Sequence, residues 1–206
     1  SFTLNCNNSN EFPDLELNNS DNPIKISKKI FRNIINQTIF ATSTQESRPV
    51  LTGINFKFNN NKLECTATDS YRLAKKEIVL SDNANDEYNI IIPTKNLNEL
   101  IRMFNDDDGD VELHIFDNKV IFKFDSIIML SRIINGVYPD TSKLIPTDFS
   151  LIIKVNLMDF YNAIDRVSLL TQSKEKNIVQ LEMKGNSIKI TSNSPEIGKS
   201  EENMVV

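Results

Sequence analysis

Ile24-Lys25-Ile26-Ser27 is a short β-rich run that leads directly into an amphipathic helical pattern. The same opening recurs at Ile90-Ile91-Ile92-Pro93-Thr94 and at Leu151-Ile152-Ile153-Lys154-Val155-Asn156. Each run ends on Ser, Thr or Asn, residue types that cap helix N-termini by accepting a hydrogen bond from a free backbone N–H. The sequence therefore predicts three copies of one structural unit, at an interval of roughly 65 residues.

An apolar stripe with helical spacing follows each opening run, because apolar residues recur every three or four positions. The stripes are Ile30, Phe31, Ile34, Ile35 and Ile39; Leu97, Leu100, Ile101 and Phe104; and Leu157, Phe160, Tyr161, Ile164 and Val167. We expect each helix to bury its stripe against a sheet.

Three short alternating strands, separated by tight polar turns, follow each helix. We expect strands at 51–58, 62–68 and 72–80, at 111–116, 119–124 and 127–134, and at 178–183, 187–191 and 196–205. The unit is thus β-α-β-β-β, and the fold class is α+β with antiparallel sheets. Since two units make a domain of ordinary size, we expect a complete domain at 20–147, the tail of a preceding domain at 1–19 and half of a further domain at 148–206.

The composition excludes several classes of protein. The 206 residues include 28 acidic and 23 basic ones, a net charge of −5, which excludes a uniformly basic nucleic-acid binder but permits a basic patch. No apolar run approaches the roughly 18 residues of a membrane span, and two cysteines favour a reducing compartment, the cytoplasm. Five glycines, without a cluster, disfavour a Rossmann or P-loop hydrolase or transferase.

The chain shows no catalytic constellation, so we expect no catalytic residue, metal or cofactor. Its single histidine, His114, alternates with Leu113 and is expected on the solvent face with Glu112. Cys65 lies within an expected strand and is interpreted as a buried apolar side chain. The run Asp106–Asp110 fails the EF-hand spacing and is interpreted as a solvated acidic turn.

The first helix carries a basic face that is free of acids. Lys28, Arg32 and Asn36 are spaced by four and should share a face, with Lys29 beside them. An ordinary solvated face and a surface that meets phosphates both explain this pattern.

Several stretches of the chain resemble the bacterial DNA polymerase III beta-subunit family, the sliding clamps. They are Gln45–Ile54, Cys65–Ala74, Gly136–Thr141 and Asn193–Gly198, with Glu11-Phe12-Pro13 similar to the end of the family's first domain. The resemblance implies the DNA-clamp fold, with helices on an inner wall and antiparallel sheets outside. It also implies a head-to-tail homodimeric ring around double-stranded DNA. Such a ring is a processivity factor and not itself an enzyme, although its holoenzyme is a DNA-directed DNA polymerase, a nucleotidyltransferase.

The resemblance implies three sets of site residues. The DNA-binding set is Lys28, Lys29, Arg32, Asn36, Gln45, Arg48, Lys95 and Arg102. The partner-peptide pocket, for the polymerase III alpha subunit and clamp-loader subunits, comprises Leu51, Thr68, Tyr71, Arg72, Leu73, Pro139, Lys143 and Leu144. The dimer interface contains Leu169 and Leu170.

One alternative interpretation stays open for the pocket residues, and another for the function. Leu51 and Leu73 could simply be core residues, and the chain has Ser70-Tyr71 where many family members have Gly-His, which would reshape the mouth of the pocket. The alternative function is a peptide-binding adaptor without DNA contact. The basic helix face separates the two, because such an adaptor has no use for it.

Overall fold

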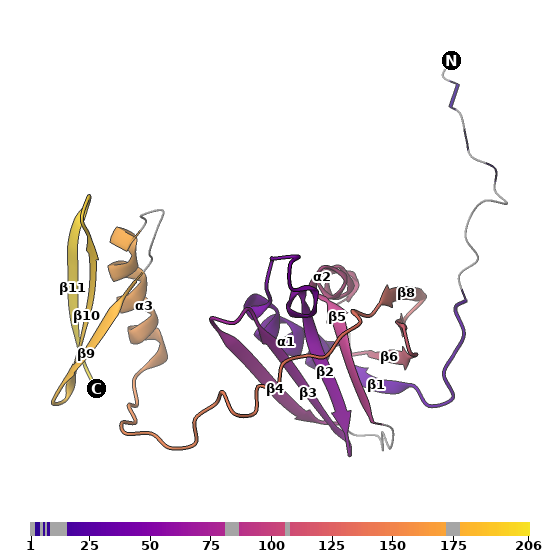
Figure 1. Cartoon of the computed structure of the whole chain (residues 1–206), viewed down its shortest axis with the longest axis horizontal. Coiled ribbons are helices and arrows are strands. Elements are labelled where there is room, and N and C mark those ends of the chain that lie inside the picture. The colour runs from indigo at the N-terminus through magenta and orange to yellow at the C-terminus, as the bar shows by residue number, and fades with distance from the viewer. Residues whose placement is uncertain are drawn as a thin grey trace. The chain divides into compact units, whose positions relative to one another are not determined.

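The computed structural model describes residues 3, 4, 6, 8, 16–80, 87–105, 108–171 and 178–206. The chain divides into two compact units, Ser1–Asp140 and Thr141–Val206 (Figure 1). The first unit contains β1 (Ile24–Ser27), α1 (Lys28–Thr38), η2 (Ile39–Ala41), η3 (Pro49–Thr52), β2 (Gly53–Asn59), β3 (Lys62–Thr68), β4 (Leu73–Val79), β5 (Tyr88–Pro93), α2 (Thr94–Met103), β6 (Asp110–Ile115), β7 (Lys119–Phe124) and β8 (Ile127–Arg132). The second contains α3 (Leu157–Ser168), η4 (Leu169–Thr171), β9 (Gln180–Lys184), β10 (Ser187–Ser194) and β11 (Gly198–Val205).

The first unit is built by strand exchange between its two β-α-β-β-β repeats. Its two antiparallel sheets have the orders β4-β3-β2-β5 and β1-β6-β7-β8. The opening strand of the first repeat, β1, therefore pairs with β6 of the second repeat, and β5 pairs with β2 of the first. Each sheet thus depends on a strand from the other repeat.

Phe31 of α1 lies at the centre of the core between the two sheets. Its fully buried ring has its centroid 5.9 Å from that of Phe56 on β2 and 6.1 Å from that of Phe122 on β7. Phe104, which follows α2, lies 6.4 Å away by the same measure. One aromatic side chain therefore joins both sheets and the end of the second helix.

The second unit is a single repeat, in which α3 packs on β10 and β11. Ala163 and Val167 of the helix form its small core with Ile188 and Ile190. The predicted cap at Asn156 is confirmed: its side-chain oxygen accepts from the backbone N–H of Met158 at 2.9 Å and from that of Asp159 at 3.2 Å.

The other two predicted caps fail in different ways, because Ser27 is at the predicted N-cap position of α1 but lacks the capping bond, whereas Thr94 is not the N-cap of α2. Ser27 makes no side-chain capping bond, and the N–H of Lys28 instead donates to the carbonyl of Gly109 at 2.9 Å. Thr94 is the first residue inside α2 rather than its cap, and its hydroxyl is buried without a hydrogen-bond partner among the described residues. In both repeats of the first unit the chain enters the helix straight from a strand.

Three residues of the predicted apolar stripes are exposed. Ile30 is 45% exposed because Phe31, Ile34 and Ile35 already fill the face of α1 that meets the core. Leu157 and Tyr161 of α3 are 76% and 61% exposed, because a three-stranded sheet covers a narrower part of the helix.

The predicted opening strand at 151–155 is also absent, since that segment has no regular structure. In the first unit an opening strand pairs only with the sheet of the other repeat. The described part of the second unit holds one repeat, so this segment has no partner there.

The prediction that His114 faces solvent is wrong. Its side chain is 2% exposed, because the backbone N–H of Ser20 donates to His114 Nδ1 at 3.0 Å and brings the preceding chain onto this face of β6. Burial of Cys65 within β3 is confirmed, and burial raises the pKa of its thiol well above the usual value.

Some predictions lie outside the described residues. These are Glu11-Phe12-Pro13 and Asp106 and Asp107 of the acidic turn. Among the described helices, none is long and apolar enough to cross a membrane.

We predict that Phe31→Ala lowers the free energy of unfolding by about 3–5 kcal/mol, because it leaves a cavity between the two sheets. Urea unfolding of the variant measures this. Ile30→Ala is the matched control on the same helix and should cost no more than about 1 kcal/mol, since Ile30 is largely exposed. Equal losses in the two variants would contradict this description of the core.

Candidate functional surfaces

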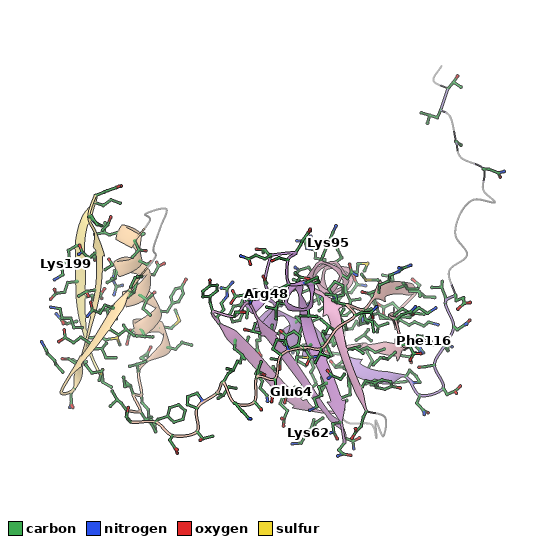
Figure 2. The ribbon with its side chains drawn as sticks, viewed as in Figure 1. Arg48, Lys62, Glu64, Lys95, Phe116 and Lys199 are labelled. Atoms are coloured by element: carbon green, nitrogen blue, oxygen red, sulfur yellow. The ribbon has the colours of Figure 1, made fainter. Side chains whose placement is uncertain are left out.

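Six of the eight predicted DNA-binding residues have exposed side chains. Lys29 and Asn36 lie on α1, Lys95 and Arg102 on α2, and Gln45 and Arg48 in the loop after α1 (Figure 2 labels Arg48 and Lys95). They place cations on both helices of the first unit.

Lys28 does not belong to this exposed set. Its side chain is 1% exposed, and Nζ donates to both carboxylate oxygens of Asp125, at 3.0 and 3.1 Å. The four-residue spacing placed Lys28 on the basic face, but the first turn of α1 lies against the turn between β7 and β8, which carries Asp125. The structure thus makes Lys28 a buried anchor of the helix rather than a free cation.

Arg32 is intermediate between these cases. It is half-buried, and Nη2 donates to the carbonyl oxygen of Phe104 at 2.6 Å. Its guanidinium carbon also lies 6.0 Å from the centroid of the Phe104 ring. Arg102 is exposed, but Nη1 lies 3.2 Å from Glu99 Oε1, which offsets part of its charge.

Two of the predicted pocket residues, Leu51 and Thr68, contact a buried tyrosine, Tyr138. Tyr138 accepts a hydrogen bond from the backbone N–H of Thr68 at 3.0 Å and packs with Leu51 and Ile91. Burial raises the pKa of the Tyr138 phenol. Leu51 and Thr68 therefore form the floor of this surface rather than its rim. Tyr138 lies in the Gly136–Thr141 stretch, but nothing in its sequence context predicts this role.

Gly136 lets the chain return to this floor. Its φ of +143° is a conformation that other residues rarely adopt, and an added Cβ would lie 2.6 Å from Val50 Cγ1. Glycine therefore satisfies both the backbone and the packing requirement just before Tyr138.

The turn 69–72 beside this floor is held rigidly. Asp69 Oδ1 accepts from the backbone N–H groups of Tyr71 and Arg72, at 2.9 and 3.0 Å, and Oδ2 accepts from Arg72 Nε at 3.0 Å. The backbone bonds from Arg72 and Tyr71 are the main reason that the pKa of Asp69 is lowered. The turn presents Tyr71 with a side chain that is 97% exposed.

Two further contacts tie this turn to the chain after α1. The Arg72 guanidinium lies 5.7 Å from the centre of the Phe40 ring, and Arg48 Nη1 donates to Ser70 Oγ at 3.2 Å. Ser70 has a φ of +77°, the left-handed region where glycine fits more easily. The hydroxyl that this chain has in place of glycine is thus engaged by Arg48.

The remaining pocket residues are divided between the two units. Leu73 is half-buried and Pro139 exposed in the first unit, whereas Lys143 and Leu144 are exposed and belong to the second. The first unit thus assembles a floor from Leu51 and Thr68 and a rim that includes Tyr71.

Comparison with known proteins decides the family. Residues 25–140 match the model of the family described as "DNA polymerase III beta subunit, central domain". Residues 142–206 match the model of the family described as "DNA polymerase III beta subunit, C-terminal domain". The chain belongs to the DNA polymerase III beta-subunit family. The resemblance found in the sequence is thereby confirmed.

Relatives within the beta-subunit family cover nearly all of this chain. The beta sliding clamp of Bacillus subtilis is 43% identical over 205 residues, which are 99% of this chain and 54% of the relative. The crystal structure of the DNA polymerase sliding clamp from Bacillus subtilis gives a TM-score of 0.92 over 96% of this chain and 52% of that one. The beta chain from Streptococcus pneumoniae, at 36% identity, gives 0.90 over the same shares. The α+β clamp fold is confirmed, and the chain spans about half the length of the curated relatives it matches.

The two predicted interface residues of this beta-subunit chain lie on η4. Leu169 is 61% exposed and Leu170 is half-buried. Leu169 thus presents an apolar side chain to solvent in the second unit.

We predict that Tyr138→Phe lowers the free energy of unfolding by about 1–3 kcal/mol, because the N–H of Thr68 is left buried without its acceptor. Chemical denaturation measures the loss. Tyr71→Phe removes the same hydroxyl from an exposed side chain and should leave stability unchanged. A Tyr138→Phe variant as stable as Tyr71→Phe would show that this hydrogen bond does not hold the floor.

Proposed function

We propose that the chain is part of a DNA sliding clamp, the processivity factor of a bacterial replicative polymerase. The observation that carries this proposal is the TM-score of 0.92, at 43% identity, to a solved sliding clamp. In the complete protein, two copies would close head to tail around duplex DNA, with Leu169 and Leu170 at the interface. Residues 1–19 would be the tail of the first clamp domain. The sequence predicts a complete second domain at 20–147 and half of the third at 148–206, although the second compact unit already begins at Thr141.

A ring that slides needs attraction to DNA without recognition of sequence. Contacts to phosphates supply affinity and carry no base information, so cations on helix surfaces suit this task. The exposed members of the predicted set, Lys29, Asn36, Gln45, Arg48, Lys95 and Arg102, would provide it. Lys28 would act only through the fold, because Asp125 already holds its ammonium group.

The second part of the proposal is that peptides of the polymerase alpha subunit and of clamp-loader subunits bind beside Tyr138. The rigid turn 69–72 supports this, because a rim that is already ordered loses little conformational entropy on binding. Tyr71 would add an aromatic contact and Arg72 a cation at that rim.

The protein itself would not carry out phosphoryl transfer. It would raise the processivity of the polymerase by tethering it. A peptide-binding adaptor without DNA contact remains the alternative, and binding to duplex DNA separates the two.

We predict that Lys29→Gln and Lys95→Gln, in the complete clamp, each reduce the slope of log affinity against log salt by about 1, because each removes one phosphate contact. Binding to a duplex at several salt concentrations measures the slope.

Lys28→Gln is the matched control on the same helix. It breaks a partly buried ion pair, so it should lower the free energy of unfolding by roughly 1–3 kcal/mol and leave the salt slope of the folded fraction unchanged. A complete clamp that does not bind duplex DNA would argue for the adaptor, whereas unchanged slopes in Lys29→Gln and Lys95→Gln would show that these two lysines do not contact phosphates.

A further inference from the structure

The outward face of the sheet β1-β6-β7-β8 contains side chains that are buried although they point away from the main core. His114, Ile121 and Leu130 are directly opposed across β6, β7 and β8. Val111, Leu113 and Ile115 occupy the other face of β6, within the core. His114 is nevertheless 2% exposed and Ile121 fully buried, so another part of the chain must cover this row.

That cover is residues 16–20, which we call the strap. Lys119 Nζ donates to the carbonyl oxygen of Glu16 at 2.9 Å, and Lys123 Nζ donates to Asn19 Oδ1. Lys119, Ile121 and Lys123 alternate along β7 and share one face. A strap held at both lysines therefore crosses Ile121.

The third attachment of the strap fixes the protonation state of a histidine. The backbone N–H of Ser20 donates to His114 Nδ1 at 3.0 Å, and Ser20 Oγ lies 3.1 Å from the same atom. A backbone N–H can only donate, so Nδ1 must carry no proton when the strap is docked. The ring is then neutral, with its proton on Nε2. Nε2 is buried and has no hydrogen-bond partner within the described part of the chain.

The charged groups around His114 do not remove this requirement. Glu112 Oε2 lies 3.7 Å from Nε2 and favours the protonated ring, but this carboxylate is also paired with Lys25 at 3.0 Å. Lys123 on β7 opposes protonation. The strap brings Glu16 to Lys119, at 3.7 Å, rather than to the ring. Burial is the largest influence, and with Lys123 it lowers the pKa of His114.

We propose that His114 is a pH-sensitive latch for the strap. A neutral ring accepts from the backbone N–H of Ser20. A protonated ring can still donate from Nδ1 to Ser20 Oγ, but it leaves that N–H without its acceptor and so weakens the docking of the strap over Ile121. This inference does not depend on the proposed function.

The direction of the pH effect follows from linkage. Docking lowers the pKa of His114 below that of a free histidine, about 6.5. The strap is therefore fully docked above that pH. As the pH falls from about 6.5 to the lowered pKa, the docking constant should decrease by up to about tenfold per pH unit.

The experiment is simple to interpret because the chain contains one histidine. An NMR titration of the 206-residue chain from about pH 8 to pH 5 would follow the imidazole, while hydrogen exchange follows the amide of Ser20. His114→Gln offers a carbonyl acceptor that does not titrate, and it corrects for the intrinsic pH dependence of exchange. The amide of Leu63 in β3 reports on global unfolding.

We expect a His114 pKa below about 6.5. The Ser20 amide should lose its protection from hydrogen exchange over the same pH range in which the imidazole is protonated, while the protection of the Leu63 amide stays unchanged. The ratio of Ser20 to Leu63 protection in the wild type decides the matter by itself, whether or not the variant docks its strap. A pKa at or above 6.5, or Ser20 protection that falls only together with that of Leu63, would overturn the proposal.

Discussion

The exchange of opening strands between the two repeats is the constraint on which the first unit depends. β1 completes the sheet of the second repeat, and β5 completes that of the first. Neither repeat alone can therefore pair all the backbone N–H and C=O groups of its own strands. The core likewise depends on both repeats, since the Phe31 ring contacts Phe56 from one sheet and Phe122 from the other. The second unit shows the converse, because its single described repeat leaves the segment 151–155 unpaired and much of α3 exposed.

The charges of the first unit are divided between folding and the proposed contact with DNA. Lys28 and Asp125 form an ion pair with each other, and the Arg32 guanidinium donates a hydrogen bond to the backbone carbonyl of Phe104. What remains exposed on α1 and α2 is a diffuse set of cations, which suits a surface that must hold DNA without stopping on one site. On the other side of the sheet β1-β6-β7-β8, Lys119 and Lys123 are likewise used within the chain, to hold the strap.

Periodicity predicted most of the fold, because the burial of alternate or every third-to-fourth residue is a local property of strands and helices. The ranges of β3 and β7 are those predicted, and the expected strand at 51–58 begins later only because residues 49–52 form a 3-10 turn. The failures at Lys28 and His114 involve neighbours that are distant in sequence. Lys28 is buried by Asp125, and the histidine by Ser20, and no spacing rule connects residues so far apart. The role of Tyr138 was missed for the same reason, since its partner is the backbone of Thr68.

Strand exchange also has a consequence for synthesis of the chain on the ribosome. β1 pairs with a strand that lies roughly 90 residues further along, so most of the first unit must emerge before either sheet is complete. At a translation rate of about 5–20 residues per second, the edge of β2 waits for several seconds before β5 arrives to cover it. During that interval the nascent first repeat presents an unpaired apolar edge, which is a target for chaperones and a site of misassembly between neighbouring nascent chains.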